Sequence, residues 1–139
     1  MKPRMLIVDD EPDMLDFMAR VFRSEYQVVR ASSGEDALRE LGRTRFTVVV
    51  TDHKMPHMTG VELLERVGQR QPYLVKVLLS GFTDVPDIER AMDRAGIHNY
   101  AVKPIDSEKL RAAVKEAIER HARGRALSDS QARRHKVES

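Results

Sequence analysis

Two apolar stretches of the chain end in acidic residues. Residues 5–10 read MLIVDD, which places Asp9 and Asp10 at the end of the first stretch. Residues 47–52 read TVVVTD, which places Asp52 at the end of the second. Carboxylates that lie close together repel one another, so their pKa values rise unless a cation joins them. Oxygen ligands without His or Cys suit Mg²⁺, so these acids predict a magnesium site if the fold brings them together.

Apolar runs and helical patterns alternate five times along the chain. The runs lie at residues 5–8, 26–31, 46–51, 74–79 and 100–102. Most are continuous rather than alternating, as expected for parallel strands that are covered on both faces. Each is followed by an apolar stripe at helical spacing, such as Leu15, Met18 and Phe22 after the first run. Helices that connect successive strands imply right-handed βαβ units and a parallel sheet.

We therefore predict an α/β fold of the flavodoxin-like (βα)₅ type, doubly wound, with a five-stranded parallel sheet of order 2-1-3-4-5. Capping signals agree with this pattern: Ser32 and Glu35 have capping-box spacing, and Gly42 and Gly96 fall where helices should end. In this strand order the chain crosses from the second strand over the first to the third. The ligand-binding crevice then lies between the first and third strands, at their carboxyl ends, where the acids are.

The remaining strand ends add two more polar groups. The fourth strand delivers a hydroxyl, Ser80, and the fifth delivers an ammonium, Lys103. A metal cation, a hydroxyl and an ammonium around one carboxylate form a receptor for a phosphoryl group. An aspartate can itself be the nucleophile, which gives an aspartyl phosphate.

At these positions the chain resembles the receiver domain of two-component response regulators. The matching motifs are LIVDDEP, TDHKMPHMTG, LLSG and YAVKP, which occur in this order and each coincide with the end of a predicted strand. The resemblance covers about residues 3–121. We expect residues 1–121 to form the receiver domain and residues 122–139 to form a basic helical extension or linker tail.

The resemblance implies a role for each matching residue. Asp52 is expected to accept a phosphoryl group from the phosphohistidine of a sensor histidine kinase. The expected Mg²⁺ ligands are Asp10 directly, Asp9 through water, the acceptor Asp52, and the backbone carbonyl of Lys54. Such a domain phosphorylates and slowly dephosphorylates only itself, so we do not expect a conventional enzyme.

The resemblance also implies a switch. Lys103 is expected to contact the phosphoryl oxygens, Ser80 to move its hydroxyl toward them, and Tyr100 to swing its ring inward. The Lys103–Pro104 peptide is expected to be cis. Lys54 and Phe82 flank the acceptor site, and we hypothesise that Phe82 obstructs water and lengthens the phosphoryl lifetime.

The switch should change the surface of helix 4, strand 5 and helix 5, and thereby signal to an output domain or a downstream protein that the sequence does not identify. A homodimer through this same surface remains open. Residues 96–106 read GIHNYAVKPID, which lacks the acids before Tyr100 and the Phe after Pro104 that are typical of winged-helix regulators. This stretch is closer to receivers attached to enzymatic or ATPase outputs.

Charge and composition restrict the remaining functions. Residues 120–139 hold six basic and two acidic residues, a net charge of +4, whereas residues 1–119 hold 18 basic and 20 acidic residues, a net charge of −2. The body is therefore not expected to bind nucleic acid directly. Cysteine is absent, and neither a membrane span nor a signal peptide is apparent, so we predict a cytoplasmic protein with no membrane partner.

Two other functions are open to a fold of this type. A phosphohydrolase of the haloacid dehalogenase type would also use an Asp nucleophile and Mg²⁺, but it usually carries a second Asp where this chain has Lys54. A flavodoxin-like cofactor binder would require a hydroxyl- and glycine-rich phosphate loop after the first strand, where the sequence DDEPD would repel phosphate. His53 and His57 do not form a helical metal pair, because Pro56 separates them.

Overall fold

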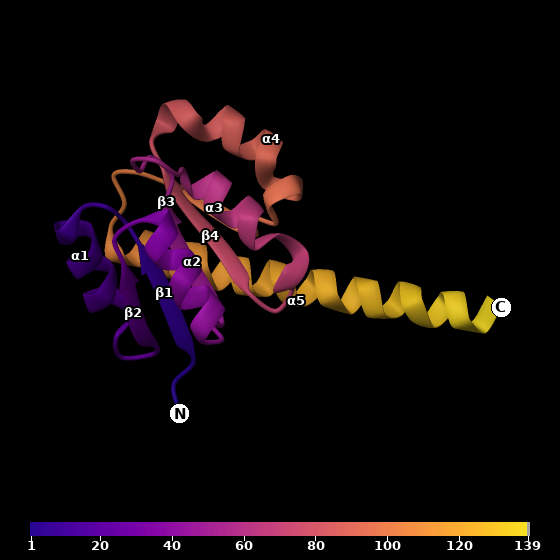
Figure 1. Ribbon diagram of the computed structural model, residues 1–139. Helices are drawn as coiled ribbons and strands as arrows, with labels where there is room; N and C mark the ends of the chain where they lie inside the picture. Colours follow the sequence, from indigo (N-terminus) through magenta and orange to yellow (C-terminus); the bar gives the residue numbers. More distant parts are fainter. Residues whose placement is uncertain (139) are drawn as a thin grey trace.

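The computed structural model describes the backbone of residues 1–138 and the side chains of residues 1–124 except that of Gln69. Five parallel strands form one sheet: β1 (Arg4–Val8), β2 (Gln27–Ala31), β3 (Val48–Asp52), β4 (Val75–Ser80) and β5 (Asn99–Val102). Their order is β2-β1-β3-β4-β5, which confirms the predicted topology. Figure 1 shows β1, β2, β3 and β4 of this sheet.

Five helices cover the two faces of the sheet. They are α1 (Pro12–Phe22), α2 (Gly34–Arg43), α3 (Gly60–Val67), α4 (Val85–Ala95) and α5 (Ser107–Glu138), with short 3₁₀ turns η1 (Gly68–Arg70) and η2 (Phe82–Asp84). One core lies between the sheet and α1 with α5, and the other lies between the sheet and α2, α3 and α4. The fold is therefore doubly wound, as the continuous apolar strands require.

Strand β4 shows how one strand serves both cores. Val75, Val77 and Leu79 belong to the core under α1 and α5. Leu78 belongs to the core under α2, α3 and α4. Since successive side chains of a strand point to opposite faces, Lys76 and Ser80 lie on the same face as Leu78.

The helix boundaries differ from the predicted ones at two places. Helix α2 is capped by Ser33, whose side chain accepts a hydrogen bond from the backbone N–H of Asp36, so the capping pair lies one residue after the predicted Ser32 and Glu35. Gly42 lies inside α2 rather than at its end, because the helix continues to Arg43. Gly96 does end α4, with a left-handed φ of 67° that favours glycine.

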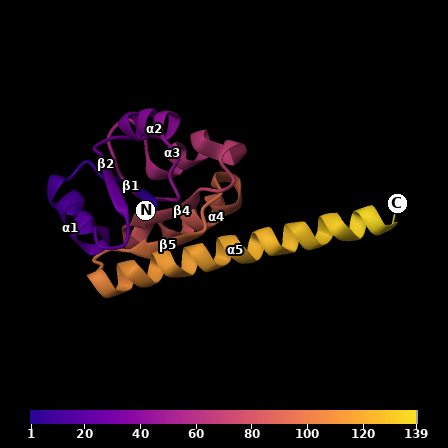
Figure 2. The same cartoon turned by 90° about the horizontal axis from the view of Figure 1, so that it is seen from below.

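Helix α5 runs along the sheet and continues beyond the body of the molecule (Figure 2). The His121 ring nitrogen Nε2 lies 2.7 Å from the carbonyl oxygen of Pro72, and its ring packs edge-on against His98. His121 is thus the last residue of α5 for which a side-chain contact with the body is described. No helix in the described part of the chain has the length and apolar character needed to cross a membrane.

Candidate functional site

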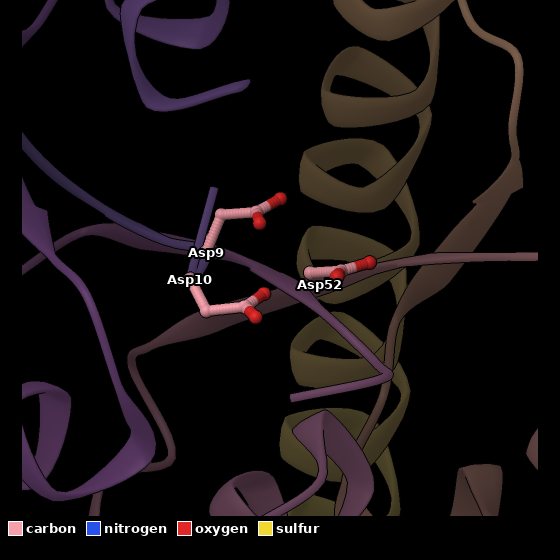
Figure 3. Close-up of side chains that lie close together, drawn as sticks. All are labelled: Asp9, Asp10 and Asp52. Carbon is pink, nitrogen blue, oxygen red and sulfur yellow. The ribbon is translucent and has the colours of Figure 1, made fainter. Parts of the chain in front are cut away.

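The register of the sheet places two of the predicted acids side by side. Val8 of β1 is paired with Thr51 of β3, so the next residues, Asp9 and Asp52, lie at the same edge of the sheet. Carboxylate oxygens of Asp9, Asp10 and Asp52 lie within 4.8 Å of one another. The three side chains converge from the ends of β1 and β3 (Figure 3). The predicted meeting of the acids is therefore observed.

The three carboxylates differ in burial and in hydrogen bonding. Asp9 is fully buried and Asp52 is 6% exposed, whereas Asp10 is exposed. The backbone N–H of Glu11 donates to Asp9 Oδ1 at 2.9 Å. Asp9 Oδ2 is buried and has no hydrogen-bond partner among the described residues. A buried carboxylate oxygen without a donor is costly, and a cation between the acids would satisfy it.

Lys103 supplies the positive charge of the site. Its backbone N–H donates to the carbonyl of Ser80 at 2.8 Å, which continues the pairing of β4 and β5 beyond the last ladder residues. Its ammonium lies 2.7 Å from Asp52 Oδ1 and 3.8 Å from Asp9 Oδ2. The peptide bond between Lys103 and Pro104 is cis, as the resemblance implied.

Burial and charge set the protonation of this group of residues. Burial raises the pKa of Asp9 from 3.8 to about 6, with the nearby Asp52 and Asp10 charges adding to the effect, although the Glu11 N–H and Lys103 oppose it. Burial alone would lower the pKa of Lys103, but its hydrogen bond to Asp52 and the charges of Asp52 and Asp9 outweigh this and raise it. The ammonium therefore remains charged at neutral pH.

The hydroxyl groups of Ser80 and Tyr100 donate hydrogen bonds to residues other than Asp52. Ser80 is 1% exposed, and its hydroxyl donates to the carbonyl of Gly81 at 3.1 Å. The Tyr100 hydroxyl donates to Glu89 Oε1 on α4 at 2.7 Å. Neither hydroxyl has a described hydrogen bond to Asp52, so the roles implied for both remain predictions.

Lys54 and Phe82 lie on the two loops that border the site. The Lys54 ammonium is 3.9 Å from Asp84 Oδ2, so an ion pair links the loop after β3 to η2. Phe82, also on η2, is 81% exposed and is one of the large apolar side chains that the fold does not cover. The obstruction of water by Phe82 stays a hypothesis.

Gly60 is a site residue that the sequence reasoning did not single out. A Cβ atom at this position would collide with the backbone carbonyl oxygen of Asp52 and would lie 2.5 Å from Leu78 Cδ1. The Gly60 N–H also donates to the carbonyl of His53 at 2.8 Å. Glycine therefore allows the start of α3 to pack against the end of β3. Its place at the end of TDHKMPHMTG was the only signal in the sequence.

The donor set fits a magnesium ion. Carboxylates and a backbone carbonyl are the hard oxygen ligands that Mg²⁺ prefers, and no His or Cys belongs to the group of Asp9, Asp10 and Asp52. The lack of a hydrogen-bond partner for Asp9 Oδ2 and the raised pKa of Asp9 both indicate an excess of negative charge. The site can thus hold a divalent cation next to an aspartate that is itself hydrogen-bonded to a lysine.

Comparison with known families decides the identity of this arrangement. The profile of the response regulator receiver domain matches residues 5–115. The chain belongs to the response regulator receiver family. Phosphorylation and Mg²⁺ dependence are general properties of this receiver family, and Asp9, Asp10 and Asp52 form its acidic cluster at the expected phosphorylation site. Receivers are signalling domains rather than conventional enzymes, which argues against a phosphohydrolase.

Individual relatives agree with this receiver assignment. The hydrogenase transcriptional regulatory protein HoxA of Cupriavidus necator is 37% identical over 115 residues, which are 83% of this chain and 24% of that protein. Sporulation initiation phosphotransferase F of Bacillus subtilis is 29% identical over 85% of this chain and 95% of its own length. A receiver domain from Clostridium thermocellum superimposes with a TM-score of 0.77 at 29% identity, covering 85% of this chain and 95% of that one.

Lengths differ widely among these relatives. The chain spans about a quarter of the length of the first curated relatives it matches. Receiver domains thus occur in longer proteins of several kinds, and the family assignment concerns this domain alone.

Proposed function

We propose that Asp52 accepts a phosphoryl group from the phosphohistidine of a sensor histidine kinase and that the modified receiver signals through α4, β5 and α5. The observation that carries this proposal is the contact between the Lys103 ammonium and Asp52 Oδ1 at 2.7 Å, beside the unpartnered Asp9 Oδ2. These groups combine a nucleophile, a cation and a place for a metal in one small volume.

The transfer is a displacement at phosphorus. A carboxylate oxygen of Asp52 attacks the phosphorus atom, a P–O bond forms, the P–N bond of the phosphohistidine breaks, and its electron pair remains on the imidazole nitrogen. Lys103 would contact the phosphoryl oxygens and offset their charge. When bound, Mg²⁺ would neutralise further charge on these oxygens, held by Asp9, Asp10, Asp52 and the carbonyl of Lys54.

The buried position of Asp52 favours this chemistry. Asp52 is 6% exposed, so a hydrogen bond from Lys103 to its carboxylate is only weakly screened by water. The same lysine would lie next to the oxygens of the incoming group without any rearrangement of the backbone. Preorganised charge of this kind is often the largest single contribution to a group transfer.

A phosphoryl group would then bias two arrangements of the neighbouring loops. It adds about −1.5 to −2 charges and new acceptor oxygens at the end of β3. In the present arrangement the Ser80 hydroxyl donates to Gly81, and the Tyr100 hydroxyl donates to Glu89. Movement of Ser80 toward the phosphoryl oxygens would shift η2 and α4 and free space for the Tyr100 ring. The outcome is a population shift on the α4, β5 and α5 surface, where a homodimer or an output domain could respond.

The phosphoryl donor needs a place to dock, and an apolar hollow borders the site. Its volume is about 530 Å³, and it is lined by Met14, Phe17, Lys103, Pro104 and Ile105. Because Lys103 reaches Asp52 from this rim, a partner seated there would have its phosphohistidine close to the acceptor. We propose this hollow as the kinase contact, with an apolar partner surface.

The domain boundary near residue 121 is part of the proposal. His121 makes the last described contact between α5 and the body, through Pro72 and His98. We propose that residues 1–121 act as the receiver and that residues 122–139 form its basic extension. A cytoplasmic location remains a prediction from the sequence.

The decisive experiment is labelling with acetyl phosphate and Mg²⁺, followed by proteolysis and mass spectrometry. We expect a gain of one phosphoryl mass on the peptide that contains Asp52, dependent on Mg²⁺ and lost in Asp52→Asn. The matched control is Asp93→Asn, which removes an exposed acid on α4 and should be labelled normally. Absence of label on Asp52, or labelling that persists in Asp52→Asn, would refute the proposal. Rapid turnover of many phosphate esters would instead point to a phosphohydrolase.

A further inference from the structure

A lysine is buried at the amino end of β4, far along the strand from Ser80. Lys76 is 3% exposed and interrupts the apolar run of residues 74–79. Among the side chains that the structure describes, no carboxylate forms an ion pair with its ammonium, and no acceptor forms a hydrogen bond with it. Burial lowers the pKa of Lys76. Its Nζ is not one of the fully buried side-chain atoms that lack a hydrogen-bond partner, so the ammonium keeps access to water while the stem of the side chain is buried.

A cavity of about 310 Å³ lies next to this lysine, beside the carboxyl ends of α3 and α4. It is lined by Gly68, Pro72, Lys76, Arg94, Gly96 and His98. A Cβ atom on Gly96 would lie 3.3 Å from the Lys76 ammonium, so the absent side chain leaves room directly beside the charge. The ammonium can therefore be reached from the cavity although the residue is buried.

The groups around the cavity carry positive or neutral charge. Arg94 holds Glu65 with its Nε at 2.9 Å, and its side chain is 65% exposed, so much of the guanidinium is accessible. His98 Nδ1 accepts the Lys76 backbone N–H at 3.0 Å, so its ring hydrogen is on Nε2. None of the lining residues is acidic. The two formal charges that line the cavity are thus both positive.

We propose that this cavity is a binding site for an oxyanion, either a phosphate group or a carboxylate group. Such a ligand would supply the acceptors that the Lys76 ammonium lacks and would form a second ion pair with the accessible part of Arg94. The backbone carbonyls at the end of α4 offset part of the ammonium charge, but they are partial charges of the helix and not a full counter-ion. The site is distinct from the acidic cluster, because it lies at the opposite edge of the sheet.

The binding test uses the full chain in a phosphate-free and carboxylate-free buffer from which divalent cations have been removed on a chelating resin, so that no divalent cation draws phosphate to the acidic edge. Amide spectra by two-dimensional NMR are recorded while sodium phosphate, sodium acetate or sodium chloride is added at equal ionic strength. We expect saturable shifts at Lys76, Gly96 and His98 with phosphate, acetate or both, and none with chloride. A response to phosphate alone identifies a phosphate ligand, and a response to acetate identifies a carboxylate.

Variants make the assignment specific. A bound anion should also raise the melting temperature of the protein. Lys76→Met keeps the apolar stem and removes the charge, so it should abolish both the saturable shifts and this rise in melting temperature. Lys109→Met, which removes an exposed lysine of α5, should retain both. Arg94→Gln provides a second variant on the surface and should weaken binding by about threefold or more.

Three outcomes would overturn the proposal. They are shifts that equal those in chloride, shifts that persist in Lys76→Met, and shifts confined to residues around Asp52 and Lys103. Each of these outcomes would mean that water and the backbone carbonyls at the end of α4 are enough to solvate the Lys76 ammonium. The proposed phosphorylation of Asp52 would be unaffected by such a failure.

Discussion

The two edges of the sheet bury charge in opposite ways. At the carboxyl edge, Asp9 and Asp52 are buried beside Lys103, whose ammonium is within 3.8 Å of both. At the amino edge, Lys76 is buried with no described acid in reach, beside a neutral His98 whose pKa is lowered to about 4, chiefly by burial. One edge therefore has an excess of negative charge, and the other has an excess of positive charge.

This difference shows what each edge can attract. The acidic edge has a buried carboxylate oxygen without a hydrogen-bond partner and can attract a cation, whereas the basic edge has an ammonium without a described ion pair beside a cavity and can attract an anion. Strand β4 connects the two, since Lys76 and Ser80 lie on the same face at its opposite ends. Helix α4 does so as well, because it begins after η2 and ends at Gly96. The two edges therefore lie at opposite ends of the same pair of elements.

The largest expected effect comes from removing the cation of the acidic edge. Lys103→Met should slow labelling of Asp52 by acetyl phosphate about 100-fold or more, because the hydrogen bond to the carboxylate and the charge next to the phosphoryl oxygens are both lost. The rate is measured by mass spectrometry over time, with Lys109→Met as the control. A loss of less than about threefold would show that Lys103 matters little for the transfer.

The second prediction concerns how much the buried Asp9 carboxylate lowers the free energy of unfolding. Its pKa in the folded protein, about 6, is above the ordinary value of 3.8, so the folded state binds the proton more tightly than the unfolded state does. Without metal, this residue therefore makes stability fall as pH rises from about 4 to about 6, with no further change above that. Asp9→Asn should remove this loss and raise the free energy of unfolding at pH 7 by about 3 kcal/mol, since each pKa unit is worth about 1.4 kcal/mol.

Denaturant unfolding in EDTA between pH 4 and pH 8 tests this, with the wild type and Asp93→Asn as references. The difference between Asp9→Asn and the wild type should grow with pH over the stated range. An equal difference at every pH would mean that the titration of Asp9 is not its source.

The third prediction is that the contribution of Lys76 to stability changes with pH in the direction opposite to that of Asp9. The pKa of Lys76 is lowered, so the folded state binds its proton less tightly and the lysine costs stability at neutral and lower pH. Lys76→Met should raise the free energy of unfolding by about 1–2 kcal/mol at neutral pH without added oxyanion. The gain should shrink as pH rises toward the ordinary lysine value. Thermal unfolding between pH 6 and pH 10 measures it, and a destabilised variant would show that the ammonium has a partner.

The smallest expected effect concerns water at the acidic edge. The exposed Phe82 ring is hypothesised to obstruct in-line attack of water on the phosphorylated Asp52. Phe82→Glu should speed dephosphorylation by about three- to tenfold, because a smaller and hydrated side chain can admit and orient water. The decay of the label after removal of acetyl phosphate gives the rate. A rate that is unchanged or slower would refute the hypothesis.

Local patterns determined most of the fold. Apolar runs that are continuous rather than alternating indicated buried parallel strands, and the alternation with helices indicated a doubly wound fold, whose flavodoxin-like order 2-1-3-4-5 the structure confirms. The acids were found because parallel strands end at a common edge, which places Asp9 and Asp52 together wherever the register is Val8 with Thr51. Such features depend on residue type and spacing, which the sequence states directly.

Contacts between distant segments were decided only by the tertiary structure. The helix cap at Ser33 in place of Ser32 reflects a choice between adjacent hydroxyls that packing settles. The full burial of Asp9 beside the exposed Asp10, and the need for Gly60 at the Asp52 carbonyl, depend on which side chains turn inward. Lys76 lies within the apolar run of residues 74–79, and only the packing around it shows that it is buried without a described ion pair. Burial and charge balance are sums over the whole neighbourhood of a residue, and a linear sequence does not specify that neighbourhood.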